Sequence, residues 1–478
     1  MFSCSDKIEE SVIKNDNAAT TQSARKEAID AKIELAKIMA KAVKNPEIRE
    51  LIRKESLKKF DNDYDVLLQF VKNNKLSSGK TLLEAISDYT ENKGRLKEIA
   101  NDLPLITFYI PDFYSADKWT ENDVPIIAVR NNENKLIAIS SEGEIAELSD
   151  KEQPYLPFIV IKTNDKVVTK GKMSGAKMSA ENFIFSNEKE SFYFLDHAFN
   201  NINPKDRGAR KISLWNSDFD PLIVEAYNRT SGCNYCSQRD WIYYGIDSRA
   251  GLNSGPLNVK FQEAVTAFEP INTGIVDVIG GWDEGTYVFV LTPALGDRYA
   301  TQVSANNKVI PISPQDIFTY TERIEHYGLF GMHTRIVRDI TGVKPYTCPA
   351  PITFVNWDME KYGDRWALVL EEFDQTVTIT RTFKNTVTFG ANFSANAGTK
   401  DKIGASLGVN ATTQKETTTE YQSEEGNDAV GNATIEWTTP VLTNYQKNLV
   451  AVEPMVGSSY EAITGAMRVS FEPVRVAP

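Results

Sequence analysis

Residues 376–421 carry the pattern that most restricts how this chain can fold. Apolar side chains occupy odd-numbered positions and uncharged polar side chains occupy most even-numbered ones, with breaks at Arg381 and Asn385. The alternation resumes after a polar turn at 398–402. Because successive side chains of a β-strand point to opposite faces, this pattern predicts a long hairpin with one apolar face and one uncharged polar face.

Two kinds of structure use such a hairpin. In a soluble β-sandwich, its apolar face packs on the core while its Thr, Ser and Asn face meets water. In a pore, each strand crosses the bilayer with about 9–11 alternating residues, which 387–397 and 403–411 roughly supply. Five Ala in the apolar row and the lack of a clear aromatic girdle favour the sandwich.

The remaining chain divides into segments of different periodicity. We expect a flexible tether at 1–23, a helical bundle at 24–101, a small β unit at 102–165 and a partly ordered connector at 166–204. Residues 205–345 and 346–478 each hold short apolar runs separated by turn residues, which is typical of β-sandwiches. The predicted fold class is therefore α+β, mainly β, with an N-terminal helical bundle, a small β unit and two β-sandwich domains.

Within 205–345, we expect strands wherever β-branched and aromatic residues gather between turn residues. The runs that meet this criterion include Leu222–Tyr227, Trp241–Tyr244, Val259–Val265, Ile275–Ile279 and Tyr287–Leu291.

The first six residues, Met1 to Asp6, resemble the end of a bacterial lipoprotein signal, in which a small residue precedes the Cys that receives the lipid. Lipidation of Cys4 would anchor the protein to a membrane without making it span the bilayer. We therefore expect a location in the bacterial cell envelope, either anchored to the outer membrane or secreted. The alternative is an incidental cysteine near a flexible terminus.

Cys233 and Cys236 form a C-x-x-C pair between segments that read as loop. In an oxidising compartment such a pair is a candidate disulfide. A reduced pair and a Cys236–Cys348 bridge are the alternatives. A zinc site would need two more ligands, and none of the three His lies at metal-motif spacing.

Two acidic loops are candidate calcium sites. Asp218 and Asp220 follow Asn216 at alternate positions, and Asp358 and Asp364 flank a turn before Trp366. Carboxylate oxygens spaced in this way can surround Ca²⁺, although the Gly and distal Glu of an EF-hand loop are missing. The alternative is that these Asp side chains bind their own turn backbone. Calcium is the only cofactor that the sequence suggests.

Several function classes receive no support. The formal net charge of −12 opposes binding to phosphate backbones, so we expect no nucleic-acid partner. H-E-x-x-H is absent, and no G-x-S-x-G stands between a predicted strand and a predicted helix. These observations point away from an enzyme, although scattered Asp and Glu could still assemble an unfamiliar hydrolytic site.

Three stretches resemble a family of uncharacterised exported bacterial lipoprotein-type proteins. They are Leu103–Pro111 with the later 157–161, Pro221–Tyr227, and Trp366–Asp374. The resemblance implies an envelope or secreted location and β-sandwich modules of C2-like topology. It implies no activity and no site residues.

The sequence therefore favours a non-enzymatic binding or interaction lipoprotein of the cell envelope. Its expected partners are the membrane, through Cys4, and an unknown surface protein or glycan. The alternative is a pore-forming or membrane-inserting protein that uses the hairpin at 376–421.

Overall fold

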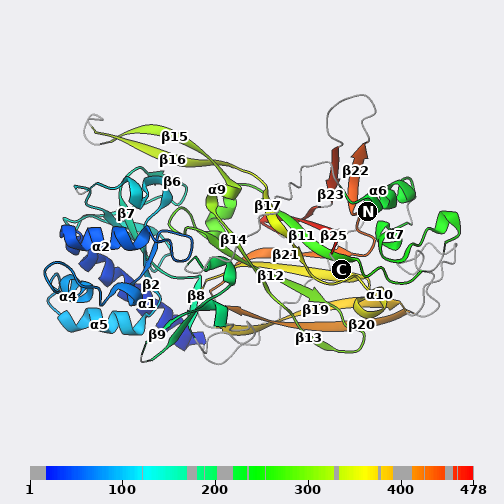
Figure 1. Ribbon diagram of the computed structural model, residues 1–478, viewed down its shortest axis with the longest axis horizontal. Coiled ribbons are helices and arrows are strands. Elements are labelled where there is room, and N and C mark those ends of the chain that lie inside the picture. The colour runs from blue at the N-terminus through cyan, green and yellow to red at the C-terminus, as the bar shows by residue number, and fades with distance from the viewer. Residues whose placement is uncertain are drawn as a thin grey trace.

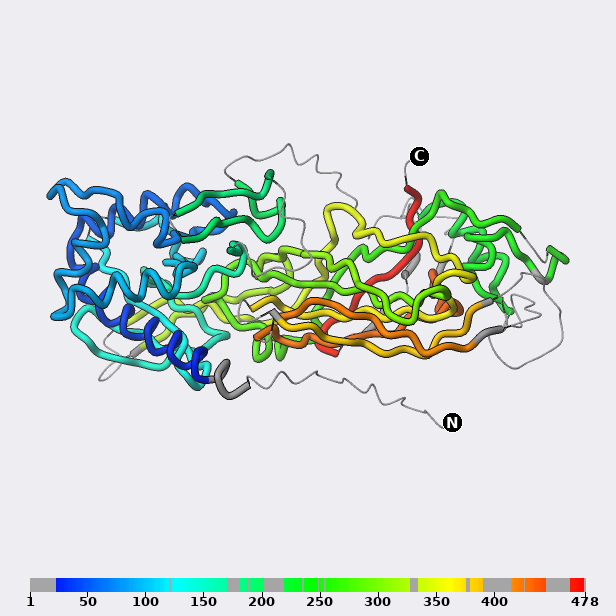
Figure 2. Tube along the Cα trace, turned by 90° about the horizontal axis from the view of Figure 1, so that it is seen from below, coloured from blue at the N-terminus to red at the C-terminus, as the bar shows by residue number. Residues whose placement is uncertain are grey.

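The computed structural model describes residues 18–120, 122–169, 180–187, 189–201, 219–233, 236–252, 255–327, 333–374, 378–390, 412–424, 426–446, 456–459, 461–463 and 465–476. The protein is α+β and mainly β, as predicted, with an N-terminal lobe and a longer C-terminal β body (Figure 1). Figure 2, turned by 90°, shows the same two parts lying end to end.

The N-terminal lobe is a six-stranded sheet with helices on one face. The strand order is β1-β2-β7-β3-β4-β5, and only β3 and β7 run parallel. The strands are β1 (Asp65–Leu67), β2 (Ile106–Tyr109), β3 (Ile126–Arg130), β4 (Leu136–Ile139), β5 (Ile145–Glu147) and β7 (Phe158–Thr163). The helices are α1 (Ala18–Ala42), α2 (Pro46–Ser56), α3 (Leu68–Val71), α4 (Leu82–Ser87) and α5 (Lys93–Asp102).

Alternation along these strands decides what each face of the sheet contacts. Ile127 and Ile161 lie in one core with the buried side chains of the helices. Ala128 and Val160, one position away, lie in a second core with Trp282 of the β body. The predicted helical bundle and β unit therefore share a core, and the β body covers the other face of the sheet.

The connector at 166–204 is ordered in part, as expected. Its strands β8 (Val167–Thr169), β9 (Phe183–Ser186) and β10 (Ser191–Phe194) form a small sheet in the order β8-β10-β9. Phe192 and Phe194 pack with Phe60 of the lobe and with Val288 and Phe373 of the β body. The connector thus fills the space between the two parts with apolar side chains.

The β body is a sandwich of two four-stranded sheets. One sheet has the order β17-β11-β25-β24 and the other β14-β12-β18-β21. Their strands are β11 (Phe261–Pro270), β12 (Tyr287–Leu295), β14 (Lys308–Ile312), β17 (Tyr346–Thr353), β18 (Arg365–Glu372), β21 (Asp428–Glu436), β24 (Glu461–Ile463) and β25 (Met467–Arg475). The core between the sheets includes the fully buried Trp357, Trp366 and Trp437.

The structure has one sandwich core where two separate sandwiches were predicted at 205–345 and 346–478. Phe261 to Pro270 pair with Met467 to Arg475, and Phe289 to Leu295 pair with Trp366 to Glu372. Each sheet therefore combines strands from both predicted domains. Turn spacing along the chain cannot reveal such pairing, because the partners lie far apart in the sequence.

Three expected strands are helical. Leu222–Tyr227 lies in α6 (Pro221–Thr230), Trp241–Tyr244 in α7 (Gln238–Tyr244), and Ile275–Ile279 overlaps α8 (Val276–Ile279). The side chain of Asp220 caps α6, and Pro221 stands in its first turn. Ser237 and Asp240 form a capping box that begins α7. These caps outweigh the β propensity of the apolar residues that follow.

A third sheet covers the outer face of the sandwich and contains the described part of the predicted hairpin. Its order is β13-β20-β19, with β13 (Gln302–Ser304), β19 (Thr378–Gly390) and β20 (Thr412–Glu424). β19 and β20 pair without a register shift from Thr378 opposite Glu424 to Gly390 opposite Thr412. Phe383 packs against Ala294 and Val369 of the second sheet. Residues 391–411 lie outside the described residues.

The remaining elements are peripheral. β15 (Phe318–Tyr327) and β16 (His333–Val343) form a long two-stranded ribbon that projects beyond the β body, with β6 (Glu152–Pro154) on its inner edge (Figure 1). The others are α9 (Pro314–Ile317), α10 (Met359–Tyr362), β22 (Leu442–Gln446), β23 (Val456–Ser459) and the short 3₁₀ turns at Asp112–Tyr114, Ala116–Lys118, Ala180–Asn182, His197–Phe199, Ser248–Ala250 and Thr273–Ile275.

A buried ion network joins the lobe to the β body. Lys166 is 0% exposed, and its Nζ lies 2.5 Å from Asp63 Oδ2, 3.1 Å from Asp65 Oδ2 and 4.0 Å from Asp61 Oδ2. Asp63 also accepts hydrogen bonds from the backbone N–H and the hydroxyl of Thr286, at 2.7 and 2.8 Å. Burial lowers the pKa of Lys166, but the three carboxylates raise it well above its usual value. Lys166 is therefore charged in the folded protein.

We predict that Lys166→Met lowers the free energy of unfolding by about 3–5 kcal/mol, because it leaves buried carboxylates without a counter-charge. Urea unfolding followed by fluorescence measures this loss. The matched control is Lys80→Met, which removes an ion pair with Asp88 whose side chains are 53% and 36% exposed. That change should leave the free energy of unfolding nearly unchanged, because water screens an exposed ion pair. Equal losses for the two variants would contradict the prediction.

Candidate functional site

The residues predicted to bind calcium do not form a shared site. Asp220 accepts the N–H of Leu222 and forms an ion pair with Arg475, with 2.6 Å between Arg475 Nε and Asp220 Oδ2. Asp358 accepts two N–H groups at the start of α10, and Asp364 accepts the N–H of Thr388 at 2.8 Å. Asp220 and Asp358 thus bind the backbone of their own turns, as in the alternative interpretation. Asp220 also pairs with Arg475, and Asp364 binds the backbone of β19 instead. Asp218 lies outside the described residues, as does Cys4.

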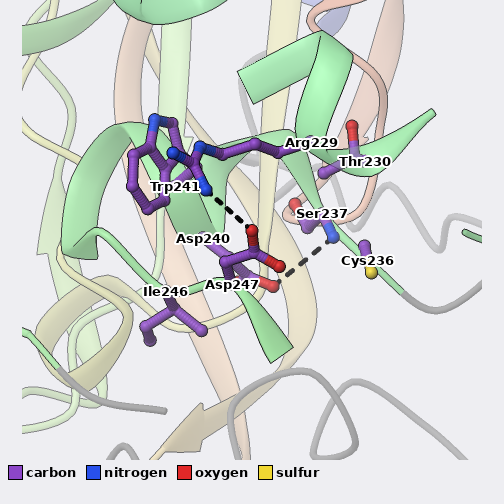
Figure 3. Close-up of a pocket in the computed structure, with 8 residues that line it drawn as sticks. All are labelled: Arg229, Thr230, Cys236, Ser237, Asp240, Trp241, Ile246 and Asp247. Carbon is purple, nitrogen blue, oxygen red and sulfur yellow. Dashed lines mark hydrogen bonds and ion pairs between the residues drawn. The ribbon is translucent and has the colours of Figure 1, made fainter. Parts of the chain in front are cut away.

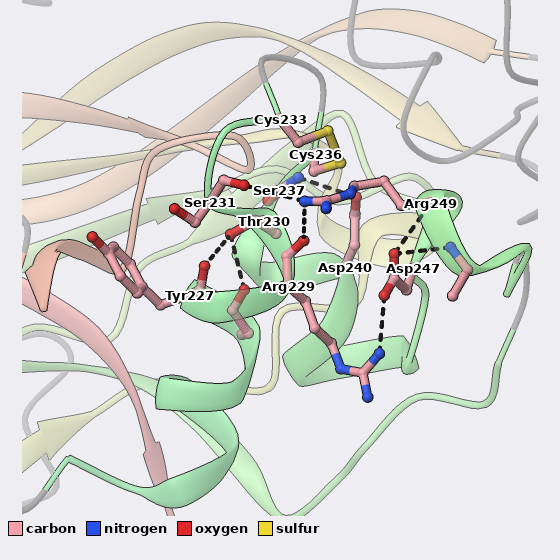
Figure 4. Close-up of a disulfide and its surroundings, with 12 residues drawn as sticks. Tyr227, Arg229, Thr230, Ser231, Cys233, Cys236, Ser237, Asp240, Asp247 and Arg249 are labelled. Carbon is pink, nitrogen blue, oxygen red and sulfur yellow. Dashed lines mark hydrogen bonds and ion pairs between the residues drawn. A yellow bond between two sulfur atoms is a disulfide. The ribbon is translucent and has the colours of Figure 1, made fainter. Parts of the chain in front are cut away.

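The structure contains the disulfide between Cys233 and Cys236 that the sequence suggested. It closes the turn between α6 and α7 (Figure 4), so its flanks are helical rather than loop. Arg249 donates to the carbonyl oxygens of Arg229 and Ser231, both at 3.1 Å. Cys348 is a buried free thiol, so the alternative Cys236–Cys348 bridge is not formed.

A small cavity borders this disulfide (Figure 3). It is lined by Arg229, Thr230, Cys236, Ser237, Asp240, Trp241, Ile246 and Asp247. Its volume of about 10 Å³ can hold roughly one water molecule. Arg229 stacks on Trp241 and pairs with Glu225 and Asp247. The cavity is therefore too small for a substrate, and the arrangement fastens α6 to α7.

Helix α7 is held to the sandwich by a second buried ion pair. Arg239 and Glu263 are both 0% exposed and lie 2.7 Å apart between Nε and Oε1, with a second contact of 3.1 Å. Gln238 donates to the carbonyl oxygen of Leu442. The disulfide and its two helices thus form a rigid cap on the end of the core.

Three carboxylates meet where the sandwich approaches the N-terminal lobe. Glu372, at the end of β18, lies directly opposite Asp428, the first residue of β21. Asp374 follows two residues after Glu372. One carboxylate oxygen from each of the three residues lies within 4.8 Å of the others. Sequence reasoning missed this cluster, because 56 residues separate Glu372 from Asp428.

Burial and like charges strongly perturb this cluster. Burial, with the charges of Glu284, Asp428 and Asp165, raises the pKa of Asp374 to about 7. Burial and the charge of Glu284 raise the pKa of Asp428 to about 6. Burial, with the charge of Asp374 first among its neighbours, raises the pKa of Glu372 well above its usual value. Because like charges directly opposite on neighbouring strands repel, these carboxyl groups take up protons at higher pH than ordinary Asp and Glu side chains do.

Glu371 shows how a neighbouring buried carboxylate is neutralised. Its side chain lies on the opposite face of β18, where it accepts hydrogen bonds from Ser423 at 2.7 Å and Asn427 at 3.0 Å. Arg381 lies 3.3 Å away. Glu372 has no such hydrogen bond or ion pair within the described part of the chain. The contrast distinguishes a structural carboxylate from a candidate ligand.

The ribbon β15–β16 presents the second candidate site. Ile324 and Ile336 lie directly opposite each other and are 67% and 41% exposed. Beside them is a groove of about 300 Å³, lined by Tyr155, Leu156, Ile324, Thr334, Arg335 and Ile336. Such a volume is at the lower end of the roughly 300–1,000 Å³ that small-ligand pockets occupy.

Cross-strand ion pairs stiffen the ribbon. Arg323 lies 2.6 Å from Asp339, Arg335 lies 2.5 Å from Glu325, and Arg338 lies 3.5 Å from Glu322. Opposite charges paired across neighbouring strands stabilise a two-stranded ribbon. The exposed Ile pair is therefore carried on a framework that holds its shape.

Comparison of the chain with protein-family models, curated proteins and solved structures finds no match. Among the described helices, none combines the length and apolarity needed to cross a bilayer.

We predict a pH dependence of stability from Glu472, which is 5% exposed on β25 and accepts a hydrogen bond from Thr266. Burial raises its pKa to about 7. Between the unfolded pKa near 4.3 and this value, the folded protein binds more protons than the unfolded chain, so stability falls as the pH rises.

Glu472→Gln should remove this contribution and raise the free energy of unfolding at pH 8 by roughly 3–4 kcal/mol, at about 1.4 kcal/mol per pKa unit. At pH 3, where Glu472 is almost fully protonated in both states, the difference from the wild type should be small. Urea unfolding at both pH values measures it. A variant that follows the wild-type profile at every pH would contradict the prediction.

Proposed function

We propose that this protein is a non-enzymatic binding protein of the bacterial cell envelope, which holds an extended segment of a partner protein along the outer edge of β15. The observation that supports this role most directly is the projecting ribbon, with its exposed Ile pair beside a groove. The lipoprotein-like sequence around Cys4 supports an envelope location. Mass spectrometry of the N-terminal peptide, from protein produced in the native organism, tests whether Cys4 is lipidated.

The edge of β15 is suited to strand addition. Within the described chain, β15 pairs only with β16, because the sheet order is β15-β16-β6. Every second residue of an edge strand turns its backbone N–H and C=O away from its partner. A long exposed edge therefore offers a template on which a peptide can form backbone hydrogen bonds. Figure 1 shows β15 on the side of the ribbon that faces away from β6 and the N-terminal lobe.

Side chains beside the edge supply selectivity. Ile324 and Ile336 form an apolar contact surface, and Tyr155 and Leu156 line the adjoining groove. In strand addition, pockets receive alternate side chains of the peptide while the backbone supplies affinity. An alternating polypeptide with one apolar face fits this arrangement. A glycan would use neither the backbone edge nor the Ile pair.

We predict that the purified protein binds an immobilised array of short peptides that alternate apolar and polar residues. Each peptide is placed beside a copy with proline at alternate positions, since proline lacks the N–H that strand addition requires. Ile324→Lys should weaken binding by roughly tenfold or more, because a charged side chain blocks edge pairing. Retention on the array, followed by titration of the best peptide, gives the measurement.

The matched control is Ile145→Lys, since Ile145 is 57% exposed on β5 of the N-terminal lobe, away from the ribbon edge. It should leave peptide binding unchanged. Equal binding to the proline copies, or equal loss in both Lys variants, would contradict strand addition. Retention on a glycan array with none on the peptides would replace the protein partner with a sugar.

The pore-forming alternative rests on the alternation within 376–421. In the described part of the hairpin, Phe383, Val387 and Phe389 are 8%, 0% and 0% exposed. Release of this hairpin would expose three large apolar side chains, at a cost of roughly 1.5–3 kcal/mol each. A membrane would have to offset that cost.

We predict that the protein leaves dye-loaded liposomes intact, because the hairpin is packed on the sandwich. Fluorescence dequenching measures leakage, with detergent as the positive limit. Leakage by the wild type well above that of protein-free liposomes would favour the pore instead.

A further inference from the structure

The backbone groups on the outer edge of β15 belong to known residues. The carbonyl oxygen of Ile336, on β16, accepts the N–H of Tyr155 at 2.8 Å, so the backbone groups of Ile336 point away from β15. Ile324 lies directly opposite Ile336. In an antiparallel pair of this kind, both residues direct their N–H and C=O away from each other. The outer edge therefore presents the backbone groups of Ile324 and, two positions away on either side, those of Glu322 and His326.

The charges of β15 are self-complementary about Ile324. Arg323 and Glu325 flank Ile324 and point to one face of the ribbon, while Glu322 and His326 share the opposite face with Ile324. An identical strand can lie antiparallel along the edge, with Ile324 opposite Ile324. Arg323 of each copy then faces Glu325 of the other, and Glu322 faces His326. The two-fold symmetry of such a pair repeats every contact.

We propose that the strand held at this edge is β15 of a second copy of this chain, with the two Ile324 residues on the two-fold axis. This inference rests on the proposed function, because it takes the same edge as the docking surface and names its occupant. The two Ile324 residues exchange two backbone hydrogen bonds, as do Glu322 and His326 in each of their two pairs. The two ribbons then form one continuous sheet.

The pairing accounts for the exposed apolar side chains of the ribbon. Ile324 and Ile336 are 67% and 41% exposed and lie side by side on neighbouring strands. The second copy continues this row with its own Ile324 and Ile336, so that each Ile324 lies between two apolar neighbours. Burial of these side chains favours association.

The opposite face of the joined sheet carries a row of charges that alternate in sign. Within one copy, Arg335 lies 2.5 Å from Glu325, and Arg323 lies 2.6 Å from Asp339. Across the two-fold axis, Glu325 of one copy meets Arg323 of the other. Opposite charges therefore follow one another from strand to strand, which stabilises a sheet and selects this register.

The first test mixes two charge-reversed variants of the full chain. Arg323→Glu and Glu325→Arg should each raise the Kd of the wild-type dimer roughly tenfold or more, because each places like charges opposite each other twice. An equimolar mixture should dimerise again, since every pair then carries opposite charges. Sedimentation velocity, with one variant fluorescently labelled, measures dimer formation. Each variant also loses an ion pair within its own ribbon, and mixing does not restore that pair, so recovery reports the contact between copies.

The second test locates the two-fold axis by cross-linking, in a Cys4→Ser background. Ile324→Cys should form a disulfide-linked dimer under mild oxidation, because opposite Cα atoms of such a pair lie about 5.5 Å apart. The matched control is Glu322→Cys, whose two copies lie four residues apart along the strands, or about 14 Å. It should remain uncross-linked.

The outcomes separate this inference from the proposed function. A wild-type chain that stays monomeric at high micromolar concentration but binds the alternating peptides would overturn self-pairing and leave strand addition standing. A monomer that also binds no peptide would overturn both. No recovery of dimers on mixing, or equal cross-linking at positions 322 and 324, would overturn the proposed register.

Discussion

The arrangement of the two parts depends on one buried cation. Lys166 lies at the start of the connector and gathers Asp61, Asp63 and Asp65, while Asp63 holds Thr286 of the β body. A buried charge costs several kcal/mol unless it is paired, so this network permits few alternative arrangements. Trp282 and the connector aromatics then fill the surrounding space. Apolar side chains provide the contact area between the lobe and the β body, and the ion network fixes how the two parts are aligned.

The same junction contains a second group of three carboxylates, Glu372, Asp374 and Asp428. Around Lys166, three carboxylates share a fully buried ammonium group. Around Glu372, three carboxylates have no cation at ion-pair distance in the described chain. Both clusters carry the desolvation cost of burial, but only the first recovers it through close ion pairs.

Period-two alternation predicted the main features of the fold. It correctly indicated a mainly β chain, and it placed a hairpin where β19 and β20 pair. It failed at α6 and α7, because the caps formed by Asp220 and Ser237 are local interactions that outweigh the propensity of the following residues. It also failed to show that β11 pairs with β25, because the sequence of one strand does not indicate which distant strand it pairs with. The acidic cluster was hidden for the same reason, as only Glu372 and Asp374 are neighbours in sequence.

The ribbon edge and the acidic cluster arise from different properties of β-structure. In the described chain, β15 has an unpaired edge, and the backbone groups along this edge can form hydrogen bonds with another strand. At β18 and β21 the edges are paired, and pairing itself forces Glu372 and Asp428 together.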